Sequence, residues 1–162
     1  MSAEVTKTGG EDVAVLPIPG ARGRVEVVGT RRIFYKVRQG GELVKRRRGG
    51  WPIQMKKGPV QKLNASGWLP GFQALYLEND KVYRFGAEVG LAPRILAFLP
   101  LTIVFVNPYI GGVLAVALFI YNIYAIKNPQ FPSKVKIALP IMNTVAGILI
   151  TIVIVGSQHP SA

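Results

Sequence analysis

Two long apolar segments constrain this chain more than any other feature of its sequence. Residues 95–126 and 135–156 are nearly free of charged side chains. A helix rises about 1.5 Å per residue, so about 20 residues cross the roughly 30 Å hydrocarbon core of a bilayer. A buried helix of a globular protein is usually shorter and carries a polar face. The sequence therefore predicts two transmembrane helices joined by a short loop.

These segments divide the chain into successive parts. We expect a flexible tail over 1–20, a basic β domain over 21–90, a first transmembrane segment over 91–127 with a kink near 107–108, a loop over 128–133, a second transmembrane helix over 134–156 and a tail over 157–162. Asn107 before Pro108 is a natural helix start. The stretch before it, residues 95–106, fits a spanning, a kinked or a re-entrant course.

The part before the apolar segments has the pattern of a small β domain. Alternating, β-branched and aromatic stretches are separated by turn sequences such as Gln39-Gly40-Gly41 and Lys57-Gly58-Pro59. About six or seven short strands at this spacing are typical of a small antiparallel β-sandwich or barrel. The fold class is thus membrane α+β. The aromatic residues expected in its core are Phe34, Tyr35, Trp51, Trp68, Phe72, Tyr76, Tyr83 and Phe85. The turn over 67–72 also fits a docking patch, but packing inside the domain is favoured.

Positive charge is concentrated in the same domain. The chain has 20 Lys and Arg against 8 acidic residues, a net charge of +12. The candidate contact residues are Lys45, Arg46, Arg47, Arg48, Lys56 and Lys57. A basic domain beside a bilayer favours contact with anionic lipid or an acidic partner, and nucleic acid is not expected. The alternative is a solvated hairpin edge that charge protects against aggregation.

Orientation depends on two opposing signals. Lys127, Lys134 and Lys136 lie at the connecting loop, which argues for a cytoplasmic loop. The basic β domain has no visible signal sequence to carry it across a membrane. Giving more weight to the second signal, we predict a multi-pass inner-membrane protein with the β domain and both termini in the cytoplasm.

Small and amide side chains line one face of each apolar segment. Gly111, Ala115 and Asn122 share a face in the first, and Asn143, Gly147 and Thr151 do so in the second. Small residues allow close helix approach, and an amide gains from a partner inside a membrane. We expect both Asn side chains to face protein, either within the hairpin or on a larger membrane protein.

Catalytic and metal-binding patterns are not found in the sequence. It contains no Cys and a single His, His159, in the polar tail. Neither a metal-ligand spacing nor a phosphate-binding loop is present. We therefore expect no enzymatic activity, no cofactor and no metal site.

Three stretches carry a resemblance to a known group of proteins. These are Trp51 to Gly58, the run Gly67-Trp68-Leu69-Pro70-Gly71-Phe72-Gln73, and Gly111-Gly112 to Asn122. In this layout the chain resembles small actinobacterial two-pass membrane proteins with an N-terminal β domain. The resemblance implies an accessory or stabilising subunit of a larger integral membrane complex, such as a lipid transporter of the Mce type. The alternative is a membrane-tethered sensor or organiser that binds anionic lipid.

Overall fold

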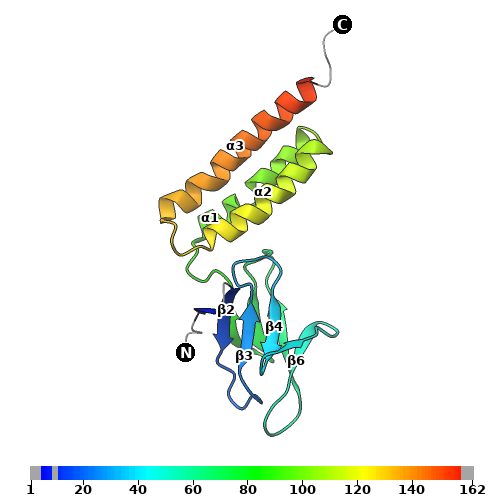
Figure 1. The fold of residues 1–162 in the computed structure, drawn as a ribbon, viewed down its shortest axis with the longest axis vertical. Coiled ribbons are helices and arrows are strands. Elements are labelled where there is room, and N and C mark those ends of the chain that lie inside the picture. The colour runs from blue at the N-terminus through cyan, green and yellow to red at the C-terminus, as the bar shows by residue number, and fades with distance from the viewer. Residues whose placement is uncertain (1–4, 9–10, 158–162) are drawn as a thin grey trace. The chain divides into compact units, whose positions relative to one another are not determined.

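The strands and the helices occupy separate parts of the chain. The computed structural model describes residues 5–8 and 11–157, and its contacts divide the chain into Met1–Ala87 and Glu88–Ala162 (Figure 1). We call these the β unit and the helical unit. The division lies close to the predicted end of the β domain at residue 90.

The β unit consists of two antiparallel sheets. The strands are β1 (Val5–Thr8), β2 (Glu11–Leu16), β3 (Val25–Val28), β4 (Lys36–Gln39), β5 (Glu42–Val44), β6 (Gly50–Ile53), β7 (Gln61–Ser66), β8 (Ala74–Leu77) and β9 (Asp80–Arg84). One sheet has the order β1-β2-β3-β4-β5 and the other β6-β7-β8-β9, and all paired neighbours are antiparallel. The predicted antiparallel β domain is confirmed.

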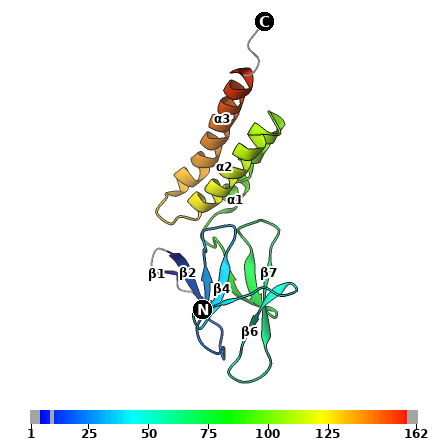
Figure 2. The same ribbon diagram turned by 45° about the vertical axis from the view of Figure 1, so that its right-hand side comes forward.

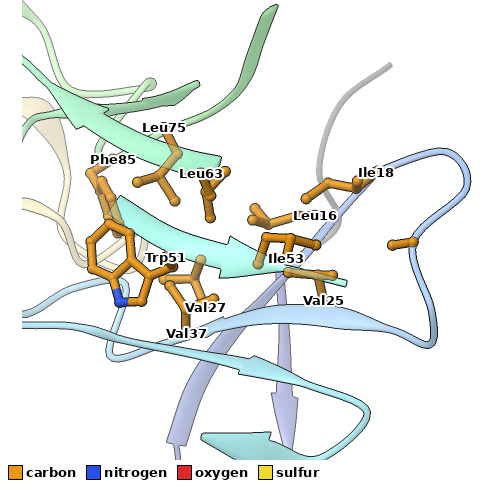
Figure 3. Close-up of a cluster of buried hydrophobic side chains, with 11 residues drawn as sticks. Leu16, Ile18, Val25, Val27, Val37, Trp51, Ile53, Leu63, Leu75 and Phe85 are labelled. Carbon is orange, nitrogen blue, oxygen red and sulfur yellow. The ribbon is translucent and has the colours of Figure 1, made fainter. Parts of the chain in front are cut away.

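Side chains from both sheets form one core. Strand alternation directs Val25 and Val27 inward and leaves Glu26 between them half-buried. The cluster contains Leu16, Ile18, Ala21, Val25, Val27, Val37, Trp51, Ile53, Leu63, Leu75 and Phe85. Trp51 and Phe85 lie at one end of it and Ile18 at the other (Figure 3). The core therefore has an aromatic end and an aliphatic end.

The N-terminal part differs from the expected flexible tail. Strand β2 pairs with β3 in the register Val13 to Val28, and it buries Val13, Ala14 and Leu16. Residues 11–16 begin with two acidic residues and contain only four apolar ones, so the sequence pattern did not indicate a strand there. Residues 1–4 and 9–10 of the predicted tail, and 158–162 of the C-terminal tail, lie outside the described residues.

The helical unit contains one helix long and apolar enough to cross a membrane, as judged over the described residues. Its elements are α1 (Leu91–Leu96), η1 (Leu99–Phe105), α2 (Ile110–Ile126) and α3 (Ser133–Ser157). Only α3, with 25 residues, meets that length. The 17 residues of α2 extend about 25 Å at 1.5 Å each, which is short of a 30 Å core. The prediction of two membrane-crossing helices is therefore not supported.

The first apolar segment reverses direction near residues 106–109. The rings of Phe98 and Phe119 are 4.8 Å apart, and Ile103 lies against Gly111, so α1 and η1 run antiparallel to α2 (Figures 1 and 2). The side-chain oxygen of Asn107 accepts hydrogen bonds from the N–H groups of Tyr109 (3.0 Å) and Ile110 (2.9 Å). The expected kink is thus a turn between two antiparallel arms.

Helix α3 then runs antiparallel to α2. The two helices are joined by a short turn in which Asn128 accepts a hydrogen bond from the Gln130 N–H. Pro140 sits inside α3, and the Thr144 hydroxyl donates to its carbonyl at 2.7 Å. The apolar side chains that α3 leaves exposed include Ile141, Met142, Val145, Leu149, Ile152 and Val153. Most of the length of α3 therefore has an uncovered apolar side.

Candidate functional site

The densest basic run forms an exposed turn between β5 and β6. Lys45, Arg46, Arg47 and Arg48 are all exposed, and Arg47 and Gly50 exchange backbone hydrogen bonds of 2.8 Å. The Arg46 guanidinium lies 5.0 Å from the centre of the Trp51 ring. Such a cation–π contact orients one arginine, while the other three side chains of the run remain exposed.

This turn lies near the end of the β unit where the chain leaves for the helical unit, which we call the exit end. Strand β9 finishes there at Arg84, which pairs with Ala74. The Tyr35 ring is 4.2 Å from the Phe85 ring and 5.6 Å from the Trp51 ring, over which Arg46 lies. The ring contacts therefore link the basic run to the residue that follows β9.

Lys56 and Lys57 lie at the opposite end of the β unit. They follow Ile53, whose strand runs away from the exit end, and the Lys56 N–H donates to the Gly20 carbonyl at 2.7 Å. The Gln39 side-chain amide joins the same end by donating to the carbonyl of Gln54 at 2.7 Å. The six predicted contact residues therefore form two separate groups, because strand β6 leads from one end of the sheet to the other between them.

Two aromatic side chains predicted in the core are instead exposed. Phe34 is 83% exposed and Trp68 is 82% exposed. In the loop of Trp68, the buried Leu69 and Phe72 fill the interior, and the Phe72 N–H donates to the Leu69 carbonyl at 3.1 Å. This turn leaves Trp68 outside. Of the other predicted aromatic residues, Trp51, Phe72 and Phe85 are buried, and Tyr35 and Tyr83 pack against the core. Tyr76 is only half-buried.

The predicted helix-packing residues converge inside the helical unit. The Asn143 side-chain NH₂ donates to the side-chain Oδ1 of Asn122 at 2.6 Å, and Asn122 is fully buried. Gly111 and Gly147 both lie against Ile103 of η1. The other two predicted packing residues, Ala115 and Thr151, are both buried. The face thus joins α2 and α3 to η1, and sequence reasoning did not identify η1 as the third element.

A buried basic residue marks the end of the helical unit at which α2 finishes. Lys127 is buried directly after α2, and Arg94 is buried in α1. Burial lowers the pKa of Lys127 to about 7, and the carboxylate of Glu88 opposes this shift by raising it. Desolvation disfavours the charged ammonium, which is the physical cause. Lys127 and Arg94 flank apolar segments in the sequence. Their burial results from the antiparallel packing of α1–η1 and α2, which the sequence did not predict.

The described part of the chain contains no group of three or more His, Cys, Asp or Glu side chains that could hold a metal ion. Comparison with protein-family models, with curated proteins and with solved structures finds no match to this chain. The features of the molecule that bear on function are the basic exit end of the β unit and the apolar helical unit.

Proposed function

We propose that this chain is a non-catalytic, membrane-anchored accessory subunit whose basic β unit binds the anionic surface next to its own membrane anchor. The observation that carries this proposal is the exposed run Lys45–Arg48 near the exit end. Each basic residue close to an acidic leaflet contributes about 1 kcal/mol to binding. The run therefore favours an anionic surface on the side from which the chain enters the membrane.

The anchor in this proposal is the helical unit. Helix α3 crosses the bilayer, and its exposed apolar side faces lipid or a membrane partner. The arms α1–η1 and α2 form an embedded hairpin that enters and returns on one side. The Asn122–Asn143 pair lies between α2 and α3, where an amide in an apolar medium needs a partner.

The returning hairpin removes the conflict between the two orientation signals. Because α1–η1 and α2 run antiparallel, the chain is back on its starting side when it reaches Lys127, Lys134 and Lys136. The basic loop and the basic β unit then share one side, and the positive-inside rule favours the cytoplasm for both. The chain beyond α3 emerges on the opposite side, in contrast to the expectation of two cytoplasmic termini.

The partner in this proposal is a larger integral membrane complex, and lipid transporters of the Mce type stay candidates through the resemblance noted above. The alternative is an anionic-lipid sensor that acts without a fixed partner, which the same basic run supports. Purification of the full chain in a mild detergent separates the two. Co-purifying subunits in fixed ratio support the accessory role, whereas a lone protein with bound acidic lipid supports the sensor.

The basic run has its own test in lipid nanodiscs. A Ser66→Cys substitution provides a single labelling site at the exit end, because the chain contains no Cys. A fluorophore there should be quenched by nitroxide headgroups more strongly in anionic than in neutral nanodiscs, and less at high salt. Changing Lys45, Arg46, Arg47 and Arg48 to Gln should abolish that difference.

The matched control changes Lys56 and Lys57 to Gln at the opposite end of the β unit. It removes positive charge from the same unit and should leave the lipid dependence in place. If the labelled protein with an unchanged basic run were quenched equally in anionic and neutral nanodiscs, that result would contradict contact with anionic lipid. A protein partner would then be the surface that the run contacts.

A further inference from the structure

The β unit exposes two large aromatic side chains although it has a complete core. Phe34 and Trp68 are among its most exposed apolar residues, at 83% and 82%. Single exposed apolar residues are common on protein surfaces. Two aromatic rings on one end of a small unit are more informative, because clustered exposed apolar groups mark interaction sites.

Both side chains belong to loops at the exit end. Trp68 lies in the β7–β8 connection, which is closed by the pairing of Ser66 with Ala74, and Ala74 pairs in turn with Arg84 at the end of β9. Phe34 lies in the β3–β4 connection, and the adjacent Tyr35 ring is 4.2 Å from the Phe85 ring. Both connections can be followed in Figures 1 and 2. The two loops therefore face the same side of the unit as the departing chain.

Each loop is held by local contacts. In the loop of Phe34, the Arg32 N–H donates to the Gly29 carbonyl at 2.9 Å, and Arg31 pairs with Asp12 at 3.4 Å. In the other loop, the buried Leu69 and Phe72 leave Trp68 outside. The aromatic rings are thus presented by ordered turns, which lowers the entropy lost when they bind.

Exposed basic residues lie next to Phe34 in the sequence and near the same end of the unit. Arg32 and Lys36 are exposed on either side of Phe34, and the run Lys45–Arg48 lies near the same end. Aromatic rings with neighbouring Lys and Arg match the bilayer interface, where rings sit at headgroup depth and cations meet phosphates. A protein partner would be recognised by shape and paired polar groups, whereas this end combines apolar tips with unpaired positive charge on the basic run.

The chain length allows these loops to reach the bilayer. Helix α1, the first helix of the helical unit, begins at Leu91, six residues after Phe85. At about 3.3–3.6 Å per residue this link spans at most roughly 22 Å. We infer that Phe34 and Trp68 insert into the lipid interface next to the anchor and hold the exit end of the β unit against the membrane. This inference rests on the proposed membrane anchoring of the helical unit.

The test uses the full chain in nanodiscs. The sequence has two Trp residues, so Trp51→Phe leaves Trp68 as the single tryptophan. We expect lipids brominated in the upper acyl chain to quench most of its emission, and aqueous iodide to quench little. The matched variant Trp68→Phe retains the buried Trp51, whose emission should respond to neither quencher. Free access of iodide to Trp68, without quenching by brominated lipid, would overturn the inference.

A second measurement leaves the core unchanged. An environment-sensitive dye on Phe34→Cys should shift to the blue in nanodiscs, while the same dye on Lys57→Cys at the opposite end should not. Identical, water-like emission at both positions would also overturn the inference. Co-elution of the protein with nanodisc lipid reports the anchoring separately. A protein that elutes with lipid but keeps Trp68 in water contradicts only the insertion, whereas a protein that elutes without lipid contradicts the anchoring itself.

Discussion

The paired amides of Asn122 and Asn143 are the most specific contact between α2 and α3. Asn122 is fully buried, and its own side-chain NH₂ has no hydrogen-bond acceptor in the structure. The 2.6 Å bond from Asn143 therefore supplies the contact that its carbonyl oxygen needs. Losing it would leave a buried amide without any partner, which is costly in an apolar environment.

We predict that Asn143→Leu destabilises the helical unit by about 1 kcal/mol, in line with interhelical bonds in membrane proteins. Insertion should be unaffected, because the change makes α3 more apolar. The Asn122→Leu/Asn143→Leu double variant should recover part of the loss, since it removes both polar groups. Thermal unfolding of the unmodified protein, the two single variants and the double variant in one detergent measures this double-mutant cycle. Additive losses would show that the two amides do not interact.

Lys127 gives the helical unit a pH dependence. Its pKa falls from 10.5 to about 7 on burial, so between these values the unfolded chain binds a proton that the folded chain does not. Stability should therefore be lowest below pH 7 and should rise as the pH increases above it. Glu88 raises the pKa of Lys127 and so weakens this effect.

We predict that Lys127→Met flattens the increase in melting temperature above pH 7. The exposed Lys134 lies in the first turn of α3 and provides the control variant Lys134→Met. Melting curves across a pH series in detergent measure both. An unchanged pH slope in Lys127→Met would mean that Lys127 is not the group responsible.

At the scale of elements, two adjacent glycines of α2 have different roles. A Cβ atom on Gly111 would lie 2.6 Å from the Ile103 carbonyl oxygen, whereas a Cβ atom on Gly112 would meet only Val104 Cγ2 at 3.9 Å. The first distance forces backbone of η1 to move, and the second is ordinary van der Waals contact. The close approach of η1 to α2 thus depends on one glycine of the pair.

We predict that Gly111→Ala destabilises the helical unit by about 1–3 kcal/mol, the usual cost of overpacking. Gly112→Ala should be neutral or stabilising by up to about 1 kcal/mol, because alanine is the better helix former. Chemical or thermal unfolding in detergent compares the two. Equal effects at both positions would contradict the packing of η1 against the start of α2.

The reversal between η1 and α2 shows how far an element can be inferred from its residues. Asn107 and Pro108 marked a helix start at the correct place, since Asn107 accepts bonds from the N–H groups of Tyr109 and Ile110. The pattern did not give the direction of the preceding arm. That direction depends on contacts distant in sequence, such as Phe98 with Phe119, which no local pattern encodes.

At the scale of the whole molecule, the antiparallel arms decide how often the chain crosses the bilayer in the membrane arrangement proposed above. Whether the α1–η1–α2 hairpin reaches the far interface or turns within the lipid, it returns to its starting side. In the proposed arrangement α3 is then the single crossing helix, and we predict that the β unit and the C-terminus lie on opposite sides. A two-helix hairpin would place both on the same side.

Single cysteines in this cysteine-free chain test the topology. We predict that Lys57→Cys and Gln130→Cys react with an impermeant maleimide only after the cell membrane is opened. Ala162→Cys should react in intact cells. Labelling of positions 57 and 162 on the same side would support two complete spans. Labelling of position 130 alone in intact cells would contradict the return of the α1–η1–α2 hairpin to its starting side.

The apolar segments and the antiparallel β domain could be predicted from local sequence patterns. Charge-free length identified the apolar segments, and alternation with turn residues identified an antiparallel β domain, because both depend on neighbouring residues in the chain. It also singled out Asn122 and Asn143, since an amide in an apolar segment needs a partner. These properties follow from each residue's own chemistry and spacing.

Which side chains contact one another and which remain exposed depends on the packing of the folded chain. Trp68 resembles a core residue by type, yet Leu69 and Phe72 occupy the interior of its loop and leave it exposed. The basic run and Lys56–Lys57 are close in sequence, yet β6 carries them to opposite ends of the β unit. The first apolar segment is long enough to cross a membrane, yet Ile103 packs on Gly111 and turns it back. Each outcome depends on contacts between distant residues, and competition for a limited interior selects among them.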